Sequence, residues 1–215
     1  MNKDLSYIGA FKNEAKIVRV ILDIMKPVVK EMYLGVQKSE DHTLKICQEY
    51  TKNVFEREPE APNYTKDFLM SKVKTKWAVW FDADEIPSYQ LVNYLMSTDF
   101  SKLMEYEAIR VPRINYIDGV ICDKNQKYTW GKYDYQFMIL RKDIRWNPTL
   151  ERACHIWPKV TNHFGINYFV YHHRSLEKIA SRTKDWNNFQ ESTRADCNSY
   201  LETVRKKVNE YVKQI

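Results

Sequence analysis

The first half of the sequence alternates short apolar runs with segments of helical periodicity, and this alternation limits the folds open to the chain. The clearest apolar run, residues 77–81, contains no polar residue at all. Strands without polar alternation are buried on both faces, as at the centre of a parallel sheet. Strands that alternate with helices build βαβ units around such a sheet. The sequence therefore predicts an α/β protein with a mainly parallel central sheet flanked by helices.

The expected elements follow one another at short intervals. Strands are expected where apolar residues cluster between polar turns, at 5–10, 32–36, 53–56 and 77–81. A first helix is expected to begin with Asn13 as its N-cap and to end at Pro27. Its apolar residues recur at helical spacing: Ile17, Val20, Ile21 and Ile24. Ser39 or Asp41 is expected to cap a second helix, a third passes through 67–70, and a fourth begins near Pro87.

The second half has a different character. Tyr, Ile and Val are frequent from 106 to 140, which favours antiparallel strands with a hairpin near Asp118-Gly119. A further strand is expected at 168–171, and a long helical region from about Ser175 meets no Gly or Pro before residue 215, which leaves room for further domains beyond it. No linker divides the chain. We therefore expect one domain over 1–215, with a helical segment at about 176–215.

Charge and composition argue against several classes of protein and of binding partner. The chain carries 34 basic and 28 acidic residues, a net charge of +6, but the two signs alternate and no run of five basic residues exists. A nucleic-acid partner is therefore not expected. With 44% hydrophobic and 14% aromatic residues the chain is not intrinsically disordered. No stretch approaches the roughly 18 apolar residues of a membrane span, so none is expected.

The cysteines and the first residues bear on the compartment. The four cysteines lie far apart and form no C-x-x-C pair: Cys47, Cys122, Cys154 and Cys197. This spacing favours free thiols in a reducing compartment. The first residues contain no long apolar segment of the secretory type. The expected location is the cytoplasm.

The feature with the most chemistry is a group of carboxylates directly after the apolar run. Asp82, Asp84 and Glu85 follow the expected carboxyl end of a buried strand, where ligands sit in open α/β sheets. Carboxylates this close repel one another unless a cation neutralises them. Hard oxygen ligands suit Mn²⁺ or Mg²⁺. The sequence thus predicts a divalent cation here, and the alternative is a solvated acidic turn that caps the next helix.

Three stretches of the sequence resemble GT-A glycosyltransferases of family 2. The first strand leads into Phe11-Lys12-Asn13-Glu14, similar to the family's K-N-E segment. Residues 36–43 correspond to its D-x-G-S-x-D-x-T and keep Ser39, Asp41 and Thr43, while Val36 and Lys38 replace the Asp and the Gly. Thr65-Lys66-Asp67 corresponds to the family's Ala-Arg-Asn. The resemblance spans roughly residues 5–175 and is strongest over the first 90.

The resemblance implies a fold, a reaction and a set of binding residues. It implies a GT-A fold, with about 1–100 binding a nucleotide-sugar and about 101–175 facing the acceptor. The implied reaction is metal-dependent, inverting hexosyl or deoxyhexosyl transfer from a UDP-sugar to a glycan or glycoprotein hydroxyl, with Mn²⁺ or Mg²⁺. The implied donor-binding residues are Ala10, Phe11, Lys12, Asn13, Glu14, Ser39, Asp41, Lys66, Asp82 and Ala83. Asp84 would bind the metal, with Asp82 on the ribose or on a metal-bound water.

Inverting transfer also needs a base that deprotonates the acceptor hydroxyl. Glu151 occupies the region where family members carry a Glu after a strand and a turn, so it is the implied base. An ion pair with Arg145 or Arg152 is the structural alternative for this residue. The other candidate bases are Asp134, Asp118 and His155.

A histidine pair follows the expected strand at 168–171. The family often has a histidine here that faces the metal or the diphosphate. Because successive strand residues point to opposite faces, only one of His172 and His173 is expected to face the site. We expect His172.

Two other function classes stay open at this point. A nucleotidyltransferase also uses an α/β sheet and paired carboxylates, but it usually has a Gly-rich phosphate loop, and residues 10–13 contain no Gly. A non-catalytic basic module that binds carbohydrate or nucleic acid is the other alternative. A narrower resemblance, to the small GT-A domain of a glycosyltransferase of large algal viruses, would place the chain in a host cytoplasm.

Overall fold

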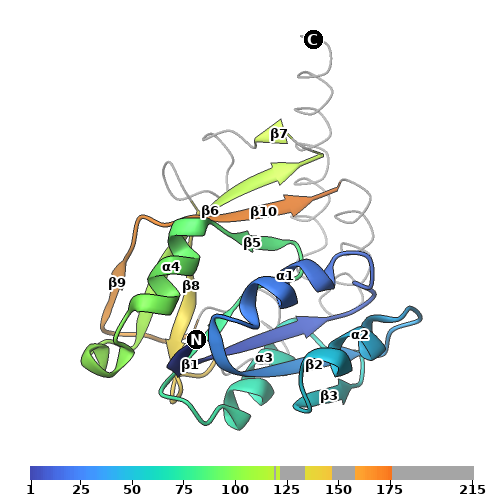
Figure 1. The fold of residues 1–215 in the computed structure, drawn as a ribbon, viewed down its shortest axis with the longest axis horizontal. Coiled ribbons are helices and arrows are strands. Elements are labelled where there is room, and N and C mark those ends of the chain that lie inside the picture. Colours follow the sequence, from blue (N-terminus) through green and yellow to red (C-terminus); the bar gives the residue numbers. More distant parts are fainter. Residues whose placement is uncertain (119, 122–133, 147–157, 176–215) are drawn as a thin grey trace.

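The computed structural model of the protein describes residues 1–118, 120–121, 134–146 and 158–175. Helices and strands alternate through the first half (Figure 1). They are β1 (Asn2–Phe11), α1 (Val18–Met25), β2 (Val29–Gln37), α2 (Thr43–Tyr50), β3 (Val54–Arg57), α3 (Pro62–Lys72), β4 (Trp77–Trp80), β5 (Glu85–Pro87), α4 (Tyr89–Ser97) and the 3₁₀ helix η1 (Phe100–Leu103). Strands dominate the described part of the second half: β6 (Ala108–Ile117), β7 (Val120–Ile121), β8 (Asp134–Arg141), β9 (His163–Gly165) and β10 (Val170–Arg174).

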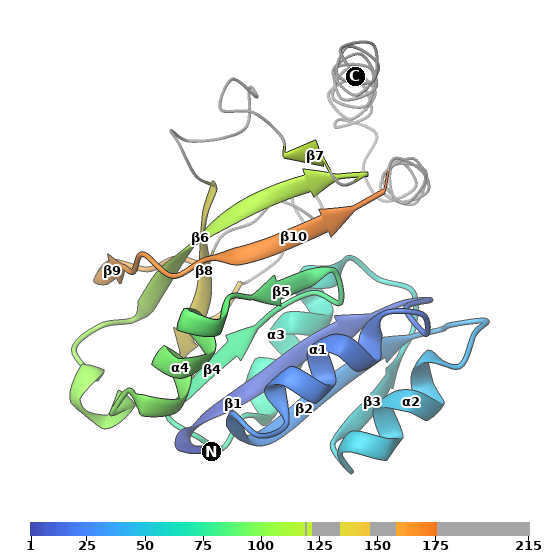
Figure 2. The ribbon, with the colours of Figure 1, turned by 45° about the horizontal axis from the view of Figure 1, so that its top comes forward.

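One curled sheet runs through the molecule in the order β3-β2-β1-β4-β8-β6-β10-β5, with β7 and β9 paired to β6. The strands β1 to β4 pair in parallel, whereas β8 joins β4 to β6 by antiparallel pairing. Figure 2 shows β5, β6 and β10 standing above the parallel part of the sheet. The α/β class and the mainly parallel, helix-flanked sheet of the Rossmann-like GT-A type are therefore confirmed. The expected helical segment at 176–215 lies outside the described residues.

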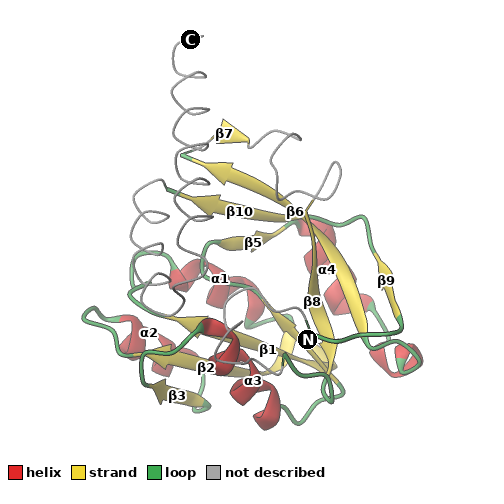
Figure 3. Ribbon diagram, turned by 180° about the vertical axis from the view of Figure 1, so that it is seen from behind, coloured by secondary structure: helices red, strands yellow, loops and turns green. Residues whose placement is uncertain are grey.

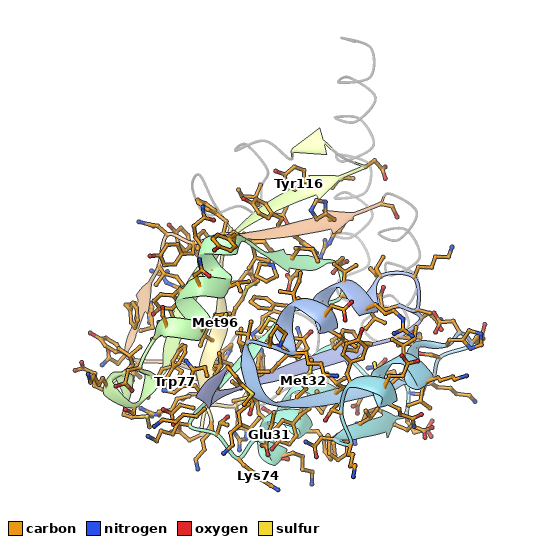
Figure 4. All side chains as sticks on the ribbon, in the orientation of Figure 1. Glu31, Met32, Lys74, Trp77, Met96 and Tyr116 are labelled. Carbon is orange, nitrogen blue, oxygen red and sulfur yellow. The ribbon has the colours of Figure 1, made fainter. Side chains whose placement is uncertain are left out.

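Helices cover the parallel part of the sheet on both faces. The near face in Figure 1 carries α1, α2 and α4, and the view from behind in Figure 3 brings α3 to the front. Apolar spacing explains the docking of α1, whose buried residues recur every three or four positions: Val18, Ile21, Leu22 and Met25. Beneath α4 and η1, the fully buried Trp77 donates its indole N–H to the carbonyl oxygen of Phe100 over 3.0 Å (Figure 4). None of the described helices is both long and apolar enough to cross a membrane.

The expected helix starts were partly wrong. Asn13 does not cap α1, which begins at Val18, because its side chain instead accepts the N–H of Glu40 over 2.9 Å and its φ is 54°. His42 occupies the N-cap position of α2, and Asp41 accepts the N–H of Thr43 over 2.9 Å. The fourth helix begins at Tyr89 with Ser88 as its N-cap, which agrees with the expected start near Pro87.

The strands of the second half agree better with the expectation. The hairpin expected near Asp118-Gly119 is confirmed, since Ile117 pairs with Val120 and Asp118 has a φ of 48°. The last described strand begins at Val170 and continues to Arg174, so both histidines belong to β10 and do not follow it.

Gly35 offers a test of how tightly α3 packs on the sheet. A Cβ added to Gly35 would lie 2.4 Å from Cγ2 of Thr65, a buried α3 residue. We therefore expect Gly35→Ala to lower the free energy of unfolding by about 1–3 kcal/mol, as for other overpacked cores. Urea unfolding measures the change. Gly165→Ala is the matched control, because its Cβ would meet nothing nearer than 3.8 Å, and equal losses in both variants would contradict close packing at Gly35.

Candidate active site

The residues expected to bind the donor gather where the parallel strands end. The arrowheads of β1, β6 and β10 point to the same side in Figure 1, and β2 and β4 run parallel to β1. The loops that follow β1, β2 and β4 therefore open at one edge of the sheet, the edge that binds ligands in open α/β folds. At this edge Phe11 and Ala83 are buried, whereas Ala10 and Lys12 are half-buried.

The loops after β1 and β2 are tied together by hydrogen bonds between the two motifs of the resemblance. Ser39 Oγ accepts the N–H of Asn13 over 3.1 Å, and Asp41 Oδ2 accepts the N–H of Ala15 over 2.9 Å. Thr43 Oγ1 accepts the N–H of Glu14 over 2.8 Å. Ser39 and Asp41 thus shape the edge of the site by holding one loop against the other.

Lys66 and Asp82 meet at the end of β4. Lys66 projects from α3, is only 6% exposed, and places Nζ 3.5 Å from Asp82 Oδ1 and 3.5 Å from the centre of the Trp80 ring. A buried ammonium is stable when a carboxylate and an aromatic face replace its water. The structure therefore sets a fixed positive charge beside the first carboxylate of the motif.

Asp84 and His172 are brought together from opposite halves of the chain. Asp84 is 3% exposed and His172 is 1% exposed, and His172 Nε2 lies 3.7 Å from Asp84 Oδ1. The main chain supports this approach, because the N–H of His173 donates to the carbonyl oxygen of Asp84 over 2.8 Å. The His173 side chain leaves the opposite face of β10, and its ring stacks on that of Tyr116 with 4.9 Å between ring centres. Of the two histidines, it is His172 that faces Asp84.

Two side chains hold the His172 ring. Its Nδ1 lies 2.8 Å from Asn115 Oδ1, and its Nε2 accepts a hydrogen bond from Arg174 Nε over 2.9 Å. An arginine can only donate, so Nε2 carries the lone pair and Nδ1 carries the proton. The hydrogen-bond network thus assigns the neutral Nδ1–H tautomer to His172.

Glu85 has a structural part in the same turn. It is fully buried, pairs with Arg113 through a 2.8 Å contact from Nη1 to Oε1, and accepts the N–H of Asp82 over 3.0 Å. Burial raises the pKa of Glu85, the nearby charge of Asp82 raises it further, and Arg113 opposes both. The alternative of a solvated acidic turn is wrong, because Asp84 and Glu85 lie inside the protein.

The Glu85–Arg113 pair predicts a pH-dependent loss of stability. Removing the guanidinium in Arg113→Met leaves a buried carboxylate without its cation, which costs about 3–5 kcal/mol when the carboxylate is charged. The raised pKa means that folded Glu85 holds its proton above the ordinary value of 4.5. Between pH 4.5 and the folded pKa of Glu85, the folded state holds more protons than the unfolded state. The free energy of unfolding therefore falls as the pH rises through this range. We expect a small loss at about pH 4 and a larger loss near pH 7.

Urea unfolding of both proteins at the two pH values measures this effect. Arg19→Met is the control, because Arg19 pairs with Glu49 on the surface and such pairs contribute little. An equal loss at both pH values would show that Arg113 acts through packing and not through charge.

Arg113, Asn115 and Arg174 were missed by the sequence reasoning. They lie on β6 and β10, and the register of the two parallel strands places Asn115 beside His172. The available signal was a pair of polar residues two positions apart in each strand, Arg113 and Asn115 in β6 and His172 and Arg174 in β10. That pattern shows a shared face, but it does not show which strand lies beside it.

The side chains of the implied base and of two of its three alternatives fall outside the part of the chain that the structure describes. Glu151 and His155 lie outside the described residues, as does the side chain of Asp134. Within the described ranges, no three His, Cys, Asp or Glu side chains form a group that could hold a metal by themselves.

Comparison with known proteins bears on the fold. No protein-family model and no curated protein matches the sequence. Among solved structures, the chain is similar to S. aureus TarS 1–349, with a TM-score of 0.56 and 12% identity over 92% of this chain and 69% of that chain. The same fragment in complex with UDP-GlcNAc gives a TM-score of 0.56 at 13% identity, over 92% of this chain and 70% of that one. A longer TarS structure gives a TM-score of 0.54 at 14% identity, over 92% of this chain and 42% of that chain. At these identities the similarity shows a shared fold, and both the family and the narrower viral resemblance stay predictions.

Proposed function

We propose that this chain is a single-domain, metal-dependent inverting glycosyltransferase that moves a sugar from a UDP-sugar to a glycan or glycoprotein hydroxyl. The observation that carries the proposal is the approach of His172 to Asp84, 3.7 Å apart and buried, on a GT-A fold at the ligand-binding edge of the sheet. The chain shares that fold with TarS, which has been crystallised with UDP-GlcNAc. This supports UDP as the nucleotide.

The chemistry of the Asp84–His172 pair fits a divalent cation. Asp84 supplies carboxylate oxygens, and His172 is held as the tautomer with its lone pair on Nε2, the ring atom 3.7 Å from Asp84 Oδ1. Mn²⁺ and Mg²⁺ are commonly bound by one or two protein side chains, with waters and substrate phosphate oxygens completing the coordination. Asp84 and His172 would hold the cation, with Asp82 nearby on a metal-bound water or the ribose. A cation held there would supply positive charge to the diphosphate leaving group.

The described residues supply the rest of the donor site. Lys66 provides a cation beside Asp82, in a place suited to the anionic diphosphate. The tied loops 12–15 and 38–43 are proposed as one wall of the donor site, with donor-binding roles for Lys12, Asn13 and Glu14. Glu151 is proposed as the base that takes the proton from the acceptor hydroxyl.

Isothermal titration calorimetry with a panel of nucleotides, with and without Mn²⁺, tests the function. We expect UDP and UDP-sugars to bind, and to bind much more tightly with Mn²⁺. A preference for nucleoside triphosphates would favour nucleotidyl transfer instead. Binding of nucleic acid with a steep salt dependence, and no nucleotide binding, would favour a non-catalytic module.

A further inference from the structure

The nitrogen of His172 that would bind a cation already has a partner. Arg174 Nε donates to Nε2 over 2.9 Å, on the side of the ring that faces Asp84 Oδ1. His172 and Arg174 are two residues apart on β10, so their side chains leave the same face of the strand. The guanidinium is therefore held next to the lone pair that a metal would need.

We propose that Arg174 is a positioning residue that occupies His172 Nε2 in the cation-free protein and is displaced when Mn²⁺ or Mg²⁺ binds. This inference rests on the proposed function. One lone pair cannot accept an N–H and coordinate a cation at the same time, so the two compete. The guanidinium meanwhile brings a positive charge to the ring nitrogen that lies 3.7 Å from Asp84 Oδ1.

Asn115 has the opposite effect on the same ring. Its Oδ1 lies 2.8 Å from Nδ1 and holds the proton there, which leaves Nε2 unprotonated for either occupant. A partner on the second nitrogen of a metal-binding histidine typically strengthens binding by fixing the tautomer and the ring orientation. Arg174 should thus weaken cation binding, whereas Asn115 should strengthen it.

The test is Mn²⁺ affinity in the absence of nucleotide, measured by calorimetry and by the electron paramagnetic resonance signal of free Mn²⁺. Arg174→Met keeps the aliphatic stem and removes the competing hydrogen bond, so we expect binding about three- to tenfold tighter, the range of one net hydrogen bond. Asn115→Leu should bind at least about tenfold more weakly. Arg19→Met, an exposed arginine on α1, should match the wild type.

The opposite directions separate this inference from simple damage to the fold, which would weaken binding in both variants. A second readout is the ¹⁵N spectrum of the histidine rings without metal. His172, assigned by the signal lost in His172→Gln, should show the Nδ1–H tautomer in the wild type, and a mixture of tautomers only when both partners are removed in the Asn115→Leu/Arg174→Met double variant.

The outcomes also separate the inference from the proposed function. Unchanged or weaker Mn²⁺ binding by Arg174→Met, with metal-dependent UDP binding intact in the wild type, would overturn the role of Arg174 alone. If neither the wild type nor Arg174→Met binds Mn²⁺, the metal site and the role of Arg174 are both overturned.

Discussion

Asp84→Asn is expected to remove metal-dependent sugar transfer while the protein stays folded. The substitution keeps the shape of a side chain that is 3% exposed, but replaces its charge by a neutral amide beside His172. Without that charge the cation is bound weakly and the leaving diphosphate is poorly stabilised. Losing one such electrostatic contribution typically slows turnover by about 10²–10³-fold. Initial rates of UDP-sugar turnover over a series of Mn²⁺ concentrations measure the effect.

The control for this variant is Asp23→Asn, a surface carboxylate on α1 that accepts a hydrogen bond from Tyr50. It should turn over at the wild-type rate at every Mn²⁺ concentration. Circular dichroism and a melting temperature within a few degrees of the wild type would show that Asp84→Asn is folded. Wild-type turnover by Asp84→Asn at limiting Mn²⁺ would remove Asp84 from the metal site.

Glu151→Gln is expected to bind the donor normally and to transfer very slowly. Glutamine preserves the shape and hydrogen bonding of the side chain, but it cannot accept the proton of the acceptor hydroxyl. Loss of a general base costs roughly 10²–10⁴-fold in rate. Calorimetry with UDP and Mn²⁺ measures donor binding, and single-turnover kinetics measure transfer.

If Glu151 only forms an ion pair with Arg145 or Arg152, Glu151→Gln should lower the stability of the protein and leave transfer nearly normal. Glu105→Gln, an exposed carboxylate in the described part of the chain, is the matched control and should leave both quantities unchanged. Near-normal transfer by Glu151→Gln would move the base to Asp134, Asp118 or His155.

Much of the first half of the fold could be predicted from local patterns. The apolar run at 77–81 became β4 and lies at the centre of the sheet, and the helical spacing of apolar residues before Pro27 became the buried face of α1. The cap assigned to Asn13 was wrong because an Asn in a loop can bond to any nearby backbone group. Its actual partner, the N–H of Glu40, belongs to the loop after the next strand.

The sequence by itself determined the order of the βα units, the carboxylates that follow the buried strand and the opposite faces of the two histidines. These features depend on periodicity and on residues within a few positions of one another. Only the tertiary structure decided that β10 pairs with β5 and sets His172 against Asp84, with Asn115 and Arg174 on its ring. Strand order and register arise from packing across the whole sheet, and no local pattern in the chain encodes which polar residues of distant strands meet.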